Sequence, residues 1–270
     1  MSARDAATHD QRRTWWLGLG LGAVFLVAIG YLAITDQLTL YMHPRYVLFT
    51  VVMTVLGGVL LLGAVLTPAA RAAVDSGHDH EHEHDYDHDH SEVPAWRRAL
   101  SAMSGGAVVA IGVVLLVAAP PQALSAATAE ARSVNAGVGI GSAVDADEVT
   151  ADSLANLTIA DWASLLQQTD DLGFWAGKRA EVVGFTTPDA DDPENVVFVS
   201  RFVVTCCAVD AQAVGVPVYW PGWQTAAPAG TWVSASGAFG GNPSARSGQT
   251  IVLEATALTP TDAPEQQYVF

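Results

Sequence analysis

The sequence predicts a membrane protein in which three N-terminal transmembrane helices precede an exported all-β domain. The chain has 270 residues, of which 50% are hydrophobic and only 15% are charged, and its mean hydropathy is positive. It nevertheless has a formal net charge of −16, so apolar and acidic residues must be segregated along the chain. The second half changes to short runs in which apolar and polar residues alternate, a pattern typical of β-strands. This half is predicted to form an OB-like five-stranded barrel with one short helix.

Three long segments without a charged residue predict the membrane helices. They cover residues 14–35, 46–70 and 99–119, and each is close to or above the roughly 20 residues that a helix needs to cross a bilayer. None of them has the polar face that a core helix of a soluble protein would show. The first segment follows Arg12 and Arg13, as in a signal peptide, but its apolar run is long for one and a second span follows at once. An uncleaved anchor is therefore predicted.

The distribution of arginine predicts which loops face the cytoplasm. Residues 1–13 and the loop 71–98 hold three arginines each, whereas the loop 36–45 holds only Arg45. Positively charged loops remain in the cytoplasm, so residues 1–13 and 71–98 are predicted to be cytoplasmic. Residues 120–270 then lie outside the cell membrane, in an oxidising environment where thiols tend to pair or to bind metal.

The predicted cytoplasmic loop contains an alternating run of histidine and acid, HDHEHEHDYDHDH, at residues 78–90. So polar a segment has little to bury and is predicted to be disordered. Imidazole and carboxylate groups together bind Zn²⁺, Cu²⁺ or Ni²⁺, so we expect this loop to bind several ions loosely. A solvated acidic linker is the alternative interpretation. The candidate ligands are the six histidines of the run, His78, His80, His82, His84, His88 and His90.

The exported domain is predicted to cover residues 153–260. Residues 120–152 are rich in alanine, serine and glycine and are predicted to be mostly linker, and residues 261–270 are predicted to be a tail. A short helix is expected at residues 158–168, because threonine and aspartate stand in capping positions at its start.

Five strands are predicted after this helix from their alternating pattern and from the turn residues between them. Gly184 and Gly237 fall inside two of these strands, at positions where a small barrel has to bend. An OB-like barrel is therefore favoured over a small open sandwich. The predicted strands cover residues 178–187, 196–206, 216–220, 231–240 and 250–260.

The two cysteines of the chain, Cys206 and Cys207, are adjacent and are followed by Asp210. In a straight strand neighbouring side chains face opposite sides, which would leave one buried and one exposed, inert thiol. If the chain turns at Cys207, the two sulfurs and Asp210 can converge on a soft or borderline cation. The sulfurs can alternatively close a strained disulfide that is easily reduced. All three interpretations remain open, and metal handling is preferred.

Two further observations restrict this site. No histidine follows His90, so a closed structural zinc site cannot be built and a metal site here must be open to water or to a partner. Arg201 lies in an otherwise apolar strand, where an unpaired charge is costly. Asp210 is its candidate partner, and a solvent-facing Arg201 is the alternative.

Several segments, together with the N-terminal multi-span region, resemble the YcgQ-like family of permease subunits, which occurs in many bacteria. They are GKRAEVVGF at 177–185, SRFVVTCCAVDA at 200–211, VPVYW at 216–220 and TWVSASG at 231–237. The most specific element is the Cys-Cys-Ala-x-Asp block, in which Val209 stands where the family commonly has alanine. The resemblance implies a bacterial plasma-membrane protein that works with a separate multi-span, permease-like protein.

The sequence also argues against several functions. The exported domain contains no histidine, so it has no Ser–His–Asp set, and the chain has no P-loop; no enzyme activity is expected. An acidic barrel outside the cell is a poor binder of nucleic acid. We therefore expect a membrane accessory subunit of a permease that handles divalent metal, with zinc as the preferred ion. The alternatives are an exported thiol–disulfide protein and a purely structural assembly module.

Overall fold

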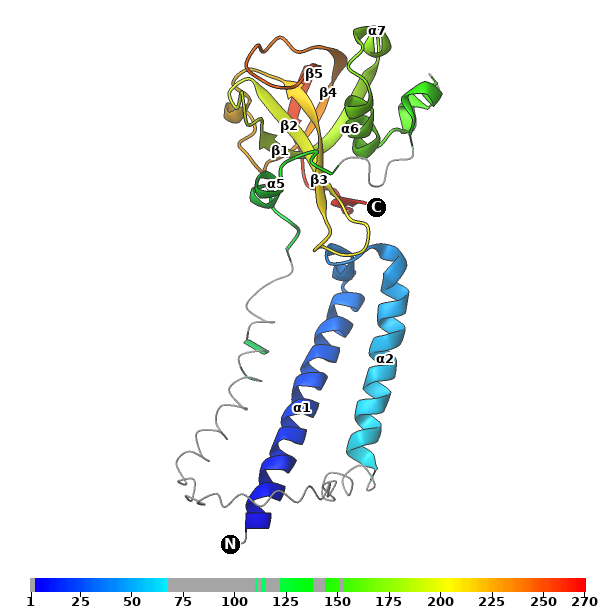
Figure 1. The fold of residues 1–270 in the computed structure, drawn as a ribbon, viewed down its shortest axis with the longest axis vertical. Helices are drawn as coiled ribbons and strands as arrows, with labels where there is room; N and C mark the ends of the chain where they lie inside the picture. The colour runs from blue at the N-terminus through cyan, green and yellow to red at the C-terminus, as the bar shows by residue number, and fades with distance from the viewer. Residues whose placement is uncertain (1–2, 68–109, 111–112, 115–121, 138–143, 151–152) are drawn as a thin grey trace, which may run out of the picture. The chain divides into compact units, whose positions relative to one another are not determined.

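The structure is a computed structural model that describes residues 3–67, 110, 113–114, 122–137, 144–150 and 153–270 (Figure 1). The predicted histidine-rich loop at 71–98 lies outside the described residues, and so does nearly all of the predicted third span at 99–119. The chain divides into two compact units. One contains Met1–Leu38 and Arg45–Pro121, and the other contains Thr39–Pro44 and Gln122–Phe270.

The first unit contains two long apolar helices, α1 (Ala3–Ile34) and α2 (Pro44–Leu66), joined by the short 3₁₀ helix η1 (Gln37–Leu40). Each helix contains a stretch that is long and apolar enough to cross a membrane and that is not buried within the protein. The first two predicted spans therefore correspond to observed helices. Proline stands at the first position of α2, where its missing N–H group costs no hydrogen bond.

Glycine allows α1 and α2 to approach each other closely. A Cβ atom at Gly22 would lie 3.2 Å from Leu61, and one at Gly57 would lie 3.2 Å from Leu26. Small residues at such positions bring helix backbones together, as they do at helix contacts within membranes. Many other apolar side chains of both helices are exposed, such as Phe25, Val27 and Leu60, so this pair exposes the kind of surface that a soluble protein would bury.

The second unit is a closed five-stranded β-barrel (Figure 1). The strand order is β1-β4-β5-β3-β2, and pairing of β2 with β1 closes it. The β3–β5 pair is parallel, whereas the other four pairs are antiparallel. The strands are β1 (Arg179–Pro188), β2 (Val196–Val203), β3 (Gln212–Tyr219), β4 (Trp232–Gly241) and β5 (Ile251–Pro260).

The two predicted bends of the barrel are confirmed at glycine. A Cβ atom at Gly184 would collide with the backbone of Ser200, and one at Gly237 would collide with the backbone of Glu254. Strand β1 pairs with β4 from Arg179 to Phe185 and with β2 from Phe185 to Pro188, so it passes from one neighbour to the other directly after Gly184. The register of β4 against β5 shifts between Ser236 and Gly237, as expected for a bulge at a barrel corner.

The largest buried side chains of the main core are the tryptophans Trp162, Trp175 and Trp223. Helix α6 (Ile159–Gln168) begins with a capping box in which Thr158 and Asp161 satisfy each other's backbone N–H groups, so the predicted short helix is confirmed. It inserts Trp162, whose ring centroid lies 4.9 Å from that of Phe239. Trp175 reaches the same phenylalanine at 4.6 Å. These buried aromatic rings stabilise the barrel through their large apolar area.

Segments that were expected to be linker and tail contribute structure to the barrel. In the expected linker, α5 (Ala126–Arg132) buries Ala129 completely, and the Asn135 side chain exchanges two hydrogen bonds with the backbone of Gly215. In the expected tail, β6 (Tyr268–Val269) pairs in parallel with β2. The Tyr268 hydroxyl accepts a hydrogen bond from the Leu124 amide, and burial raises the pKa of this tyrosine.

Four shorter elements complete the second unit. Helix α7 carries the buried Trp175 into the main core, and the 3₁₀ turn η4 contributes the buried Trp223 to it. Their bounds are α7 (Leu172–Trp175), η2 (Ala146–Glu148), η3 (Leu154–Asn156) and η4 (Trp223–Thr225).

Candidate metal centre

Both cysteines lie in the loop between β2 and β3, beyond the end of the sheet. Strand β2 ends at Val203 and β3 begins at Gln212, so the predicted strand at 196–206 is too long and the predicted strand at 216–220 begins too late. The Val204 amide donates its hydrogen bond to Val269, and the amides that follow bond to Asp210 instead of to a neighbouring strand. The strand ends because its next donors have a local acceptor.

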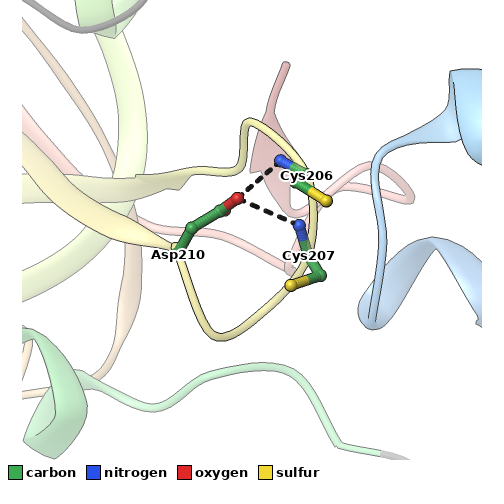
Figure 2. A group of neighbouring side chains, drawn as sticks. All are labelled: Cys206, Cys207 and Asp210. Carbon is green, nitrogen blue, oxygen red and sulfur yellow. Dashed lines mark hydrogen bonds between the residues drawn. The ribbon is translucent and has the colours of Figure 1, made fainter.

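Asp210 organises this loop through its carboxylate (Figure 2). One oxygen accepts from the amide of Thr205 at 3.2 Å. The other accepts from the amides of Cys206 and Cys207 at 2.7 and 3.3 Å. The Asp210 amide in turn donates to the Cys207 carbonyl at 3.0 Å. These four bonds close a tight turn, so the chain turns at the cysteines, as the sequence allowed.

The turn brings three potential ligand atoms together. The two Sγ atoms and one carboxylate oxygen of Asp210 all lie within 4.8 Å of one another. Tetrahedral ligands of a zinc ion with Zn–S bonds of about 2.3 Å are about 3.8 Å apart, so small side-chain rotations would suffice to place them around one ion. Cys206 and Asp210 are exposed, Cys207 is half-buried, and both cysteines are thiols. Solvent and a dissolved ion can therefore reach the group.

The surroundings of this group contain a segment that sequence analysis did not connect with it. Residues Thr39–Pro44 belong to the same compact unit as the barrel, and Met42 forms an antiparallel bridge with Cys207. The His43 amide donates to the Cys206 carbonyl at 2.9 Å, and the Ala208 amide donates to the Tyr41 carbonyl at 2.8 Å. No local sequence pattern could have indicated this pairing, because the two segments are separated by most of the chain.

Arg201 does not have the partner that the sequence suggested. Its guanidinium donates to the backbone carbonyls of Gln266 and Gln267 and lies 5.9 Å from the ring centroid of Trp232. Burial lowers the pKa of this guanidinium from its ordinary value. Arg201 therefore fastens the C-terminal segment to β2, and Asp210 uses its oxygens on the loop amides. Its support for the cysteine loop is indirect, through the strand that precedes it.

Among the described residues, Cys206, Cys207 and Asp210 are the one group of histidine, cysteine and acidic side chains whose ligand atoms come this close together. His43 is near in sequence to the bridge, but its ring lies edge-on to that of Phe270, with centroids 4.9 Å apart. The six candidate histidines between His78 and His90 lie outside the described residues.

Comparison with known proteins finds similarity to known domains in both parts of the chain. A search of curated proteins and of solved structures found no match. Residues 20–135 match the DUF1980 N-terminal domain, and residues 143–270 match the DUF1980 C-terminal domain. The second match contains the whole barrel and the cysteine loop. The two matched regions together cover most of the chain, which is therefore similar to the DUF1980 domains along most of its length.

Proposed function

We propose that this protein is a non-enzymatic membrane subunit that binds a metal ion at its exported barrel and works with a permease. The observation that carries the proposal is the convergence of Cys206, Cys207 and Asp210 within 4.8 Å on an exposed loop. Two thiolates and a carboxylate suit a borderline ion such as Zn²⁺. Three ligands are one fewer than a closed structural zinc site has. A site with an open position suits an ion that is received from one partner and passed to another.

The fold supports a role in presenting this loop. The barrel is closed by five strands, and the parallel β3–β5 pairing is its one departure from antiparallel order. We infer an OB-type barrel from this order, although such barrels host many functions and the fold alone assigns none. The β2–β3 hairpin holds the cysteines on a turn closed by Asp210, so their sulfurs lie close together without an ion.

The pairing of Thr39–Pro44 with the barrel supports the predicted sidedness. Both segments belong to one compact unit, so both lie on the same side of any membrane that the helices cross. The chain leaves this unit through α2 and returns to it by Gln122. If α2 crosses the membrane, the chain must cross again between residues 67 and 121. We propose that the predicted third span at 99–119 provides that crossing, and the arginine distribution favours a barrel outside the cell.

The proposed permease partner rests on the resemblance of the sequence to YcgQ-like subunits. In this scheme the cytoplasmic histidines His78–His90 provide a second, looser store of metal on the other side of the membrane. Purification of the tagged chain from bacterial membranes in mild detergent should recover a multi-span protein in stoichiometric amount. Recovery of the chain alone, under conditions that preserve other membrane complexes, would contradict the partnership.

Metal titration tests the site itself. The full chain is purified with its six loop histidines replaced by asparagine, so that the loop does not contribute, and is kept reduced. Zn²⁺ should bind at about one ion per chain, Cys207→Ser should abolish binding and Asp210→Asn should weaken it. Asp262→Asn, which removes an exposed acid outside the site, is the matched control and should bind as the parent does.

Two outcomes would replace this function with another. If the parent chain binds no metal but shows a reversible two-electron thiol couple, the thiol–disulfide alternative stands in its place. If it shows neither, and a chain with both Cys206→Ala and Cys207→Ala supports normal permease function, the pair is structural.

A thiol reagent that does not cross membranes tests the sidedness separately. Cys206 and Cys207 are the only cysteines, so labelling of intact cells, after mild reduction and chelation, reports their location directly. We expect full labelling without lysis. In a chain without these cysteines, Ser76→Cys in the histidine-rich loop should be labelled only after lysis, and labelling of that cysteine in intact cells would overturn the topology.

A further inference from the structure

Met42, which lies between α1 and α2, forms an isolated antiparallel bridge with Cys207 of the cysteine loop. The two hydrogen bonds that join the segments run from His43 to Cys206 and from Ala208 to Tyr41. They flank the Met42–Cys207 pair, which is therefore the non-hydrogen-bonded pair of an antiparallel ladder. In such a pair the Cα atoms are about 4.5 Å apart and the two side chains project from the same face.

This geometry places the Met42 side chain beside that of Cys207. The Met42 and Cys207 side chains are both half-buried, as expected for two neighbours that cover each other. The Sγ atom of Cys206 lies within 4.8 Å of that of Cys207. A methionine side chain is long and unbranched, so its thioether can turn toward a neighbouring group without moving the backbone.

The possible oxygen ligand of the group, the Asp210 carboxylate, already accepts hydrogen bonds from the loop. Both carboxylate oxygens of Asp210 accept backbone amides of the loop, three in all. Drawing an oxygen onto a metal ion would weaken the turn that brings the sulfurs together. None of the four hydrogen bonds that close the turn involves a sulfur atom, so sulfur ligands could bind an ion without breaking the turn. The His43 ring lies edge-on to that of Phe270. Thiolate and thioether ligands without oxygen or nitrogen select Cu(I) over harder ions.

We propose that Met42, Cys206 and Cys207 form a three-sulfur site for Cu(I), with Asp210 holding the turn and not binding the ion. The inference rests on the proposed metal-binding function and changes its preferred ion from zinc to monovalent copper. It also makes the site a composite of the barrel and of the segment between α1 and α2, so that metal binding depends on both parts of the chain.

The test compares Met42→Leu with the matched control Met53→Leu, which makes the same change on α2 at a side chain that is 49% exposed. Both variants are made in the full chain that lacks the loop histidines, and Cu(I) affinity is measured anaerobically by competition with a chromogenic chelator. Met42→Leu should weaken Cu(I) at least about tenfold, since loss of an outer-shell partner alone costs a metal site that much. It should leave Zn²⁺ affinity unchanged, and Met53→Leu should change neither.

X-ray absorption at the copper edge provides a second readout that does not depend on affinity. The parent should show a shell of three sulfur scatterers, and Met42→Leu should show two. If Met42→Leu binds Cu(I) as the parent does, or if the parent shell contains oxygen or nitrogen in place of the third sulfur, the assignment of Met42 is wrong. If the parent binds Zn²⁺ but not Cu(I), this inference fails while the proposed function stands. If it binds neither ion, both fail.

Discussion

Two loops of the barrel are each organised by aspartate, and they differ in what they leave exposed. In the β1–β2 loop, Asp189 accepts the amides of Asp191 and Asp192 at 3.0 and 2.8 Å. The Asp192 carboxylate then accepts hydrogen bonds from the side chains of Asn195 and Ser244. Asp189 and Asp192 are 3% and 1% exposed. In the β2–β3 loop, Asp210 accepts three amides in the same manner but remains exposed, together with Cys206.

The comparison separates the structural part of the cysteine loop from its chemical part. An aspartate that accepts amides two to five residues away is a general means of ending a strand and closing a turn. In the β1–β2 loop, Asp189 and Asp192 are buried, and Ser244 from the segment between β4 and β5 bonds to Asp192, so both acids serve to hold the loop together. In the β2–β3 loop the same arrangement remains open and presents two thiols. Closing the turn is thus a sufficient reason for Asp210 in the Cys-Cys-Ala-Val-Asp block. It gives no reason for the two cysteine side chains, which take no part in those hydrogen bonds.

The largest effect on stability is expected from Asp192→Ala. This substitution removes a buried acceptor that joins the β1–β2 loop to Ser244 in the segment between β4 and β5. The part-buried donors of Asn195 and Ser244 then lose that acceptor, which is costly. The midpoint of thermal unfolding, followed by near-ultraviolet circular dichroism of the packed tryptophans, should fall by several degrees. The exposed neighbour Asp191→Ala is the control, and an equal fall there would contradict the argument.

The second effect is the dependence of this loop on pH. The hydrogen bond from Ser244, followed by that from Asn195, lowers the pKa of Asp192 below its ordinary value of 3.8. Because the folded-state pKa is the lower one, the contribution of this carboxylate to stability is present above pH 3.8 and is lost as the pH falls through the folded-state value. Urea unfolding of the parent chain should show this loss in acid. Asp192→Asn, with no proton to gain, should show a shallower decline, and parallel curves would exclude the role.

A smaller effect is expected from Asp210→Ala. The three amides that lose their acceptor lie on an exposed turn, so water can replace it and the free energy of unfolding should change less than in Asp192→Ala. The local consequence is looser structure. Hydrogen exchange at residues 205–207 should accelerate while exchange within β2 remains slow. Acceleration throughout β2 would mean that Asp210 supports the sheet as well as the turn.

The smallest effect on stability is expected from the cysteines themselves. Cys206→Ser and Cys207→Ser should each change the free energy of unfolding by no more than about 0.5 kcal/mol, as is usual for residues outside a core. Modification by a soluble thiol reagent should be faster at the exposed Cys206 than at the half-buried Cys207. Chemical denaturation of the metal-free chains measures the first expectation, and mass spectrometry of single-cysteine variants measures the second. A large loss of stability in either variant would make the pair structural.

The sequence alone was sufficient for the features that depend on neighbours along the chain. The first two spans, the helix capped by Thr158 and Asp161, and the five strands followed from local periodicity and capping. The bends at Gly184 and Gly237 could be located because a strand interior rarely contains glycine unless another backbone comes close. Local patterns carry such information because each depends on the preferences and side-chain directions of adjacent residues.

Only the tertiary structure decided which distant segments complete the barrel and its candidate site. The C-terminal strand β6, the helix α5 and the Met42–Cys207 bridge all join residues far apart in the chain. Their segments are short or rich in small residues and carry little periodicity of their own. The end of β2 at Val203 was missed for a related reason, since apolar residues continue past it while their amides bond elsewhere. A backbone N–H group bonds to the acceptor that the folded chain places next to it. That acceptor can be far away in the sequence, so local sequence patterns do not identify it.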